Sequence, residues 1–140
     1  MALIKCVLDT NIVVSAHLNR DGFPQRILRL GLARRIQLYV SNEILEEYEE
    51  VLRRKKFGID PKKVNDSLRA IRHAAILVRP KRNLSLSPDP DDNKFLECAD
   101  AAEVNYLVTG NIRHFPKAFG NTHVVNAREF IEIFALGFQR

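Results

Sequence analysis

The stretch LIKCVLDTN at residues 3–11 decides the fold class. Its centre, residues 4–8, is a short and largely apolar run that ends at a carboxylate, Asp9. A run of this kind is typical of a strand that is buried on both faces, as in a parallel sheet. A carboxylate at the end of a buried strand is unfavourable unless another group compensates its charge. The stretch therefore predicts a parallel sheet with a polar site at one strand end.

Apolar runs alternate with amphipathic stretches along the rest of the chain. Four more strands are predicted, at residues 36–40, 76–78, 106–109 and 122–125, and five helices, at residues 24–33, 42–55, 61–75, 92–103 and 127–136, with a loop at 81–90. Strands that alternate with helices of this length indicate βαβ units. We therefore expect an α/β fold, a three-layer α/β/α sandwich with a central, mostly parallel five-stranded sheet, formed by one domain over residues 1–140.

The composition excludes several classes of protein. The chain has 140 residues, of which 46% are hydrophobic and 28% charged, and these fractions argue against a disordered or fibrous chain. No stretch approaches 18 apolar residues, and the first ten residues lack the pattern of a signal peptide. Cys6 and Cys98 lie in apolar surroundings and are too few for a disulfide framework. We expect a soluble, cytoplasmic protein with no membrane association and reduced thiols.

The net charge of +5 is unevenly distributed. Residues 53–82, which we call the basic segment, contain eleven lysines and arginines but only two aspartates. Acidic residues gather instead at 43–50 and 89–103. This pattern suits a protein that attracts a polyanion and holds a cation near it, although solvated helix faces would produce the same pattern.

Polar residues follow two of the predicted strands directly. Asp9-Thr10-Asn11 follows the first strand and Thr109-Gly110-Asn111 follows the fourth. In parallel sheets, sites form at the carboxyl ends of the strands. Asp91 or Asp92 caps the helix that leads into the fourth strand, and a carboxylate at such a position has a structural role of its own. Asp92 shares a helical face with the apolar Leu96, so we expect it at the inward rim of the site.

The five glutamates at 43–50 cannot all face the site. Glu43, Glu46 and Glu50 lie opposite the apolar stripe of their helix, whereas Glu47 and Glu49 flank it. Helical periodicity leaves Glu47 and Glu49 as the two that could reach inward, and it does not choose between them.

Several carboxylates at one end of a sheet repel one another unless a cation neutralises them. Oxygen ligands in small number suit Mg²⁺ or Mn²⁺. The four histidines show no zinc-ligand spacing, and the sequence lacks the Walker A, dinucleotide-binding and serine-hydrolase motifs. The residues thus predict an Mg²⁺ or Mn²⁺ site.

Four segments of the sequence together resemble the PIN-domain family. They are VLDTN at 7–11, YVSNEILEEYEEVLRRKKF at 39–57, SPDPDDNKFLECA at 87–99 and YLVTGNIRHFP at 106–116. The branch that they resemble most comprises the VapC-like toxin ribonucleases of type II toxin–antitoxin pairs. The resemblance implies an α/β/α fold and an Mg²⁺- or Mn²⁺-dependent endoribonuclease that cuts single-stranded RNA or structured RNA loops. It also implies a cognate antitoxin partner and a homodimer.

The resemblance also implies roles for particular residues. By position, Asp9, Glu47 and Asp92 match the first three acids of the family, with Asp9 and Asp92 as the metal ligands. The fourth acid of the family falls on Asn111, an uncharged residue, which the toxin branch often has here. We expect a catalytic set of Asp9, Glu47, Asp92 and Asn111, and substrate contacts from Thr10, Asn11, Thr109 and Arg113. Glu97 is a weaker candidate.

Two other functions fit parts of the sequence. A phosphatase could use Asp9 as its nucleophile, but a haloacid-dehalogenase-type enzyme needs a second aspartate where Asn11 stands. A catalytically weakened RNA-binding domain would explain the uncharged Asn111. Mg²⁺-dependent cleavage of RNA distinguishes the nuclease from both.

Overall fold

The computed structural model describes residues 2–84 and 89–138 of the chain. Its centre is a six-stranded sheet with the strand order β3-β2-β1-β4-β6-β5. The strands are β1 (Lys5–Leu8), β2 (Gln37–Val40), β3 (Ile76–Leu77), β4 (Tyr106–Val108), β5 (Ala118–Phe119) and β6 (Thr122–Val125). All neighbours pair in parallel except β5, which runs antiparallel to β6. The expected mostly parallel sheet is therefore confirmed, with one strand more than the sequence predicted.

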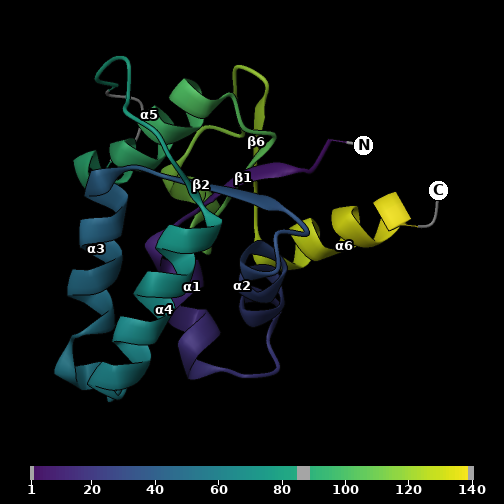
Figure 1. Cartoon of the computed structure of the whole chain (residues 1–140). Coiled ribbons are helices and arrows are strands. Elements are labelled where there is room, and N and C mark those ends of the chain that lie inside the picture. Colours follow the sequence, from purple (N-terminus) through teal and green to yellow (C-terminus); the bar gives the residue numbers. More distant parts are fainter. Residues whose placement is uncertain (1, 85–88, 139–140) are drawn as a thin grey trace.

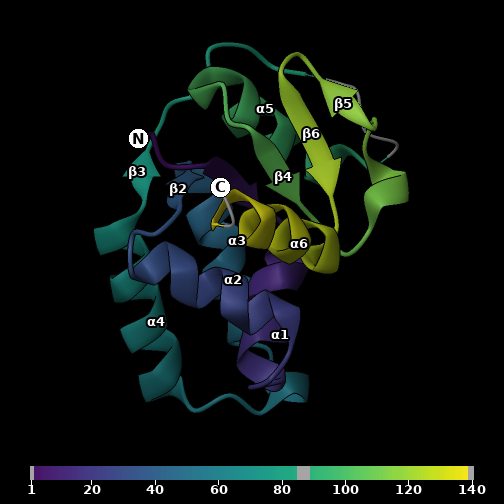
Figure 2. The same ribbon diagram turned by 90° about the vertical axis from the view of Figure 1, so that its right-hand side faces the viewer.

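Helices cover both faces of the sheet, as expected for an α/β/α sandwich (Figure 1). They are α1 (Thr10–Leu18), α2 (Phe23–Leu32), α3 (Asn42–Leu52), α4 (Pro61–Ala74), α5 (Asn93–Ala102) and α6 (Ala127–Phe138). In Figure 1, α5 lies on one side of the sheet and the other helices on the opposite side, and α5 contacts the central strands β1, β2 and β4. Figure 2 shows α1, α2 and α6 next to one another below the strands. No helix in residues 2–84 and 89–138 has the length and apolar character needed to cross a membrane.

The strand order reverses between β1 and β4. From β1 the chain proceeds to β2 and β3 on one side, while β4 and β6 lie on the other. In open α/β sheets, the crevice outside the carboxyl ends of the strands at such a reversal is the usual ligand site. The register pairs Leu8 with Val108, and the amide of Asp9 donates to the carbonyl of Val108 at 2.9 Å. The residues that follow β1 and β4 therefore lie side by side.

The sequence did not predict two elements, α1 and β5. Helix α1 contains Ile12, Val13, Val14 and Ala16, all buried, so it has no polar stripe of helical period and contains two consecutive β-branched valines. Strand β5 has only two residues and joins β6 through a turn at Gly120, whose φ is +57°. An alternation of two residues is too short to be recognised as a strand pattern. The predicted loop at 81–90 includes residues 85–88, which lie outside the described part of the chain.

Candidate active site

The carboxylate of Asp9 lies at the reversal point of the sheet. It is only 5% exposed, and its Oδ2 accepts a hydrogen bond from the hydroxyl of Thr109 at 2.7 Å. Thr109 in turn accepts from the backbone amide of Asn111 at 2.9 Å. We had expected Thr109 to contact substrate, but its side chain is fully buried. Its hydroxyl holds Asp9 in place from inside the protein, where substrate has no access.

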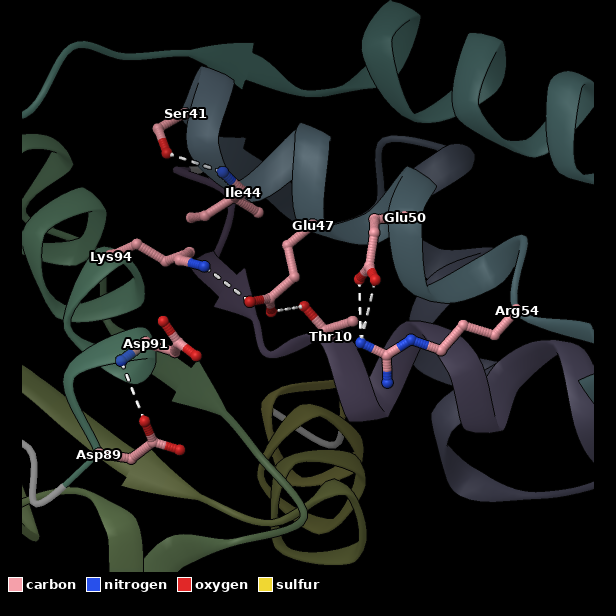
Figure 3. Close-up of polar contacts among 9 residues, drawn as sticks. All are labelled: Thr10, Ser41, Ile44, Glu47, Glu50, Arg54, Asp89, Asp91 and Lys94. Atoms are coloured by element: carbon pink, nitrogen blue, oxygen red, sulfur yellow. Dashed lines mark hydrogen bonds and ion pairs between the residues drawn. The ribbon is translucent and has the colours of Figure 1, made fainter. Parts of the chain in front are cut away.

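Glu47 reaches the same strand end from α3. The buried Tyr48 donates to the carbonyl of Leu8 at 2.5 Å, which fixes α3 against the end of β1. Glu47 then receives a hydrogen bond from the hydroxyl of Thr10 and an ion pair from Lys94, whose Nζ lies 2.6 Å from Oε1 (Figure 3). Glu49, the other candidate from periodicity, pairs with Arg53 on the outside of the helix instead. Of the two glutamates, the structure brings Glu47 to Thr10.

Asp92 comes from the turn before α5. Asp92 occupies the N-cap position of α5, one of the two positions that the sequence predicted, while Asp89 caps the preceding turn by accepting from the amide of Asp91 at 3.0 Å (Figure 3). Asp92 makes no cap hydrogen bond, and its Oδ2 lies 3.1 Å from Nδ1 of His114 instead. Its side chain is 15% exposed, which agrees with a position at the inward rim. Because its carboxylate makes no cap hydrogen bond, Asp92 is available to the site.

The carboxylates of the site influence one another. Burial raises the pKa of Asp9 to about 6, and the negative charges of Asp92 and Glu47 add to the rise, although the hydrogen bond from Thr109 opposes it. Burial also raises the pKa of Asp92, against the opposing hydrogen bond of His114. Two acids with raised pKa values, one buried and one partly buried, that interact electrostatically are typical of a functional site.

Lys94 places a cation in direct contact with Glu47 in this acidic site. Burial alone would lower its pKa, but the hydrogen bond and the charge of Glu47 outweigh that effect and raise it. Lys94 stands two residues after Asp92, so the N-terminal end of α5 brings an acidic and a basic side chain to the site. No local pattern predicts this role for Lys94, because its contact with Glu47 joins residues 47 positions apart in the sequence.

The remaining predicted residues differ in exposure and in their contacts. The side chain of Asn11 accepts from the amide of Gly110 at 3.0 Å, and Thr10 is buried beneath it. Asn111 and Arg113 are exposed. Glu97, the weaker candidate, is buried and accepts from the amide of Leu84 at 2.8 Å, which is a structural role.

The donor atoms of this crevice fit a hard divalent cation. Asp89, Asp92 and His114 each offer one ligand atom, and these atoms lie within 4.8 Å of one another. Asp9 adds a buried carboxylate that interacts electrostatically with Asp92. A set dominated by carboxylate oxygens suits Mg²⁺ or Mn²⁺. His114 and Asp89 were not among the residues that the sequence predicted for the site.

The chain belongs to the PIN-domain family, since the model of that family, described as PIN domain, matches residues 5–113. This finding confirms the resemblance seen in the sequence. The chain is 31% identical to the Uncharacterized protein MJ1680 of Methanocaldococcus jannaschii, in an alignment that covers 94% of this chain and 92% of the relative. Its fold is similar to that in a crystal structure of VapBC2 from Rickettsia felis bound to a DNA fragment from their promoter. That match has a TM-score of 0.56 and 20% identity, and it covers 88% of this chain and 98% of the other.

Proposed function

We propose that this protein is an Mg²⁺- or Mn²⁺-dependent endoribonuclease and the toxin of a type II toxin–antitoxin pair. PIN domains are in general nucleases, which supports the hydrolysis of a phosphodiester. The observation that carries the proposal is the carboxylate of Asp9, whose pKa is raised by burial and further by the negative charges of Asp92 and Glu47. Carboxylates this close favour a bound divalent cation, the usual aid to phosphodiester hydrolysis.

Asp9 and Asp92 are the residues that would hold the cation, with the amide oxygen of Asn111 as a further candidate. When bound, the ion would activate a water molecule and polarise the scissile phosphate. The hydroxyl of Thr109 and the imidazole of His114 each fix one carboxylate, so both acids are oriented before any ligand arrives. Such preorganisation lowers the reorganisation needed during the reaction.

Glu47 is the candidate acceptor for the proton of the attacking water. Thr10 and Lys94 bind its two oxygens from opposite elements, which restricts the carboxylate to one orientation. The hydroxyl of Thr10 donates its hydrogen to Glu47. We therefore propose that Thr10 orients Glu47, in place of the substrate contact expected from the sequence. Asn11 and Arg113 at the rim remain the candidates for contact with RNA.

The proposed partners follow from the family and from the fold. The similar structure contains VapBC2, and this supports a cognate antitoxin for the present protein. We further propose a homodimer that acts on RNA in the cytoplasm. The exposed lysines of the basic segment would bind phosphates that flank the cleavage site.

Cleavage of RNA by the purified protein tests the proposal. Single-stranded RNA should be cut with Mg²⁺ or Mn²⁺ and remain intact with a chelator, and Asp9→Asn and Asp92→Asn should each lower the rate by at least about a hundredfold. The matched control is Glu49→Gln on α3, which should keep the wild-type rate. Equal cleavage by the wild type and both aspartate variants would refute the site. RNA binding with no cleavage under any metal would favour the weakened RNA-binding domain.

The toxin assignment needs a separate experiment in cells. Induced expression should arrest growth, and co-expression of a small protein encoded beside this chain should relieve the arrest. The Asp9→Asn variant serves as the control, because it should not arrest growth. Arrest by that variant at the wild-type level would contradict a toxic nuclease activity.

A further inference from the structure

A pocket of about 460 Å³ opens beside Asn111, next to the acidic crevice but outside it. Its lining includes three asparagines and a serine, namely Asn11, Asn111, Asn126 and Ser15, together with Pro24 and Arg128. We call it the asparagine pocket. Its volume is within the range of sites for small organic groups. The asparagine pocket is connected to Asp9 through Thr109, which binds both the carboxylate of Asp9 and the backbone of Asn111.

The charge of the lining distinguishes this pocket from a second one of similar volume. The second pocket contains Glu47 and Lys94, and it is lined by three further glutamates as well. That lining, which also includes Asp91 and Arg54, is net negative and suits a cation better than a further anionic group. No carboxylate lines the asparagine pocket, and Arg128, its charged lining residue, is paired with Glu132 at 3.3 Å. A neutral part of a nucleotide therefore fits the asparagine pocket better than it fits the second pocket. It also fits the asparagine pocket better than a free phosphate does.

The asparagines present hydrogen-bond donors in particular. The Oδ1 atom of Asn11 accepts from the amide of Gly110 at 3.0 Å, and that of Asn126 accepts from the amide of Glu129 at 2.8 Å. Each oxygen thus already accepts one hydrogen bond, while the Nδ2 group has no protein partner among residues 2–84 and 89–138. Two amide donors without partners match a ligand that presents acceptors.

We propose that the asparagine pocket binds the base of the nucleotide beside the scissile phosphate and favours guanine or uracil there. This inference rests on the proposed nuclease function and deepens it. Keto oxygens, such as O6 of guanine and O4 of uracil, accept from amide groups, whereas adenine and cytosine present amino donors at the corresponding positions. The apolar faces of Ile12 and Pro24 provide a surface for the flat ring.

Cleavage of a random-sequence RNA pool, read by sequencing of the products, tests this proposal. The wild type should cut with a preference for guanine or uracil at one position next to the cleaved bond. Asn126→Ser keeps an oxygen to cap α6 but removes the amide donor, so it should reduce that preference about fivefold at that position alone. Ser15→Trp should fill the pocket and abolish the preference.

The matched control is Asn121→Ser in a different pocket, which should leave the preference unchanged. An unchanged preference in both Asn126→Ser and Ser15→Trp, with normal thermal unfolding, would overturn the proposal. A wild-type preference for adenine or cytosine would do the same.

A binding experiment separates failure of this inference from failure of the nuclease function. The four nucleoside 5′-monophosphates are titrated into the metal-free protein, and the side-chain amide signals are followed by NMR. Guanosine and uridine monophosphates should shift the amide signals of Asn11 and Asn126, and Asn126→Ser should weaken the effect. This outcome would support the pocket even if no RNA is cut. If none of the four shifts these signals, the pocket does not bind bases.

Discussion

At the scale of the residue, Asp9 is an acid whose charge destabilises the fold. Its pKa rises from the ordinary value near 4 to about 6 in the folded protein. The folded state thus binds the proton more tightly than the unfolded chain does. As the pH increases from about 4 through about 6, the folded protein loses stability relative to the unfolded chain, by about 3 kcal/mol in total.

Asp9→Asn should therefore stabilise the metal-free protein at pH 8 by up to about 3 kcal/mol and have little effect at pH 4. The amide oxygen of asparagine can still accept from Thr109, so the hydrogen bond is kept. Thermal unfolding with a chelator at both pH values measures this difference. The exposed Asp21→Asn is the control and should not change the melting temperature at either pH. A lower melting temperature of Asp9→Asn at pH 8 would contradict the argument.

Asn111 stands at the position where the sequence resemblance places the fourth acid of the family. Asn111→Asp adds a negative charge near the cation, so it should lower the Mg²⁺ concentration for half-maximal cleavage several-fold. Repulsion among the carboxylates offsets part of this gain. Asn111→Ala should raise the midpoint. Titration of Mg²⁺ against cleavage compares the two variants, and identical midpoints would mean that Asn111 takes no part in metal binding.

At the scale of the element, α2 and β2 approach closely at Gly31. A Cβ atom placed on Gly31 would lie 2.4 Å from a terminal methyl carbon of the buried Leu38. Gly31→Ala should therefore lower the free energy of unfolding by about 1–3 kcal/mol, although alanine favours helix. Chemical denaturation measures the change. Gly137→Ala, where nothing lies within 4 Å of the new atom, is the control and should be neutral or slightly stabilising.

Much of the element order could be predicted from local pattern, and the exceptions have physical reasons. Strand β1 and the position of Asp9 follow from one apolar run that ends in an acid. Helix α1 is buried on too many sides to show an amphipathic period. The choice of Glu47 over Glu49 depends on Tyr48 reaching Leu8 across 40 residues, which periodicity cannot reveal.

The pairings inside the site were the least accessible to sequence analysis. His114 and Asp92 are 22 residues apart, and Lys94 and Glu47 are 47 apart. Such contacts depend on how strands and helices are arranged in space. In the sequence, Lys94 is notable only because it directly follows the acidic residues at 89–92. Its role becomes clear only when α3, which carries Glu47, is known to pack against this end of α5.

At the scale of the whole molecule, the basic segment divides into paired and unpaired charges. Arg53 and Arg54, which directly follow α3, each form an ion pair at 3.0 Å with a glutamate of that helix. Lys55 and Lys56 are exposed and have no carboxylate partner in the part of the chain that the structure describes. We therefore expect the two lysines to contribute more to RNA binding than the two arginines.

Replacement of Lys55 and Lys56 by Gln should weaken RNA binding. It should also reduce the slope of log affinity against log salt by about 0.7 for each lost phosphate contact. The same replacement at Arg53 and Arg54 is the matched comparison and should change the slope less. Binding of single-stranded RNA to the Asp92→Asn protein over a range of salt concentrations gives both slopes. Equal slopes for all variants would place the RNA on another face.

The two outer strands, β3 and β5, each contain only two residues. An edge strand offers unpaired backbone groups to other chains, and length makes it a better template for aggregation. Here one edge is followed by Arg79 and Pro80, and Pro80 has no amide hydrogen to donate. The sheet therefore has little capacity to extend into a second molecule. Concentrated protein should resist fibre formation, and we expect two copies that associate to do so through surfaces other than the sheet edges.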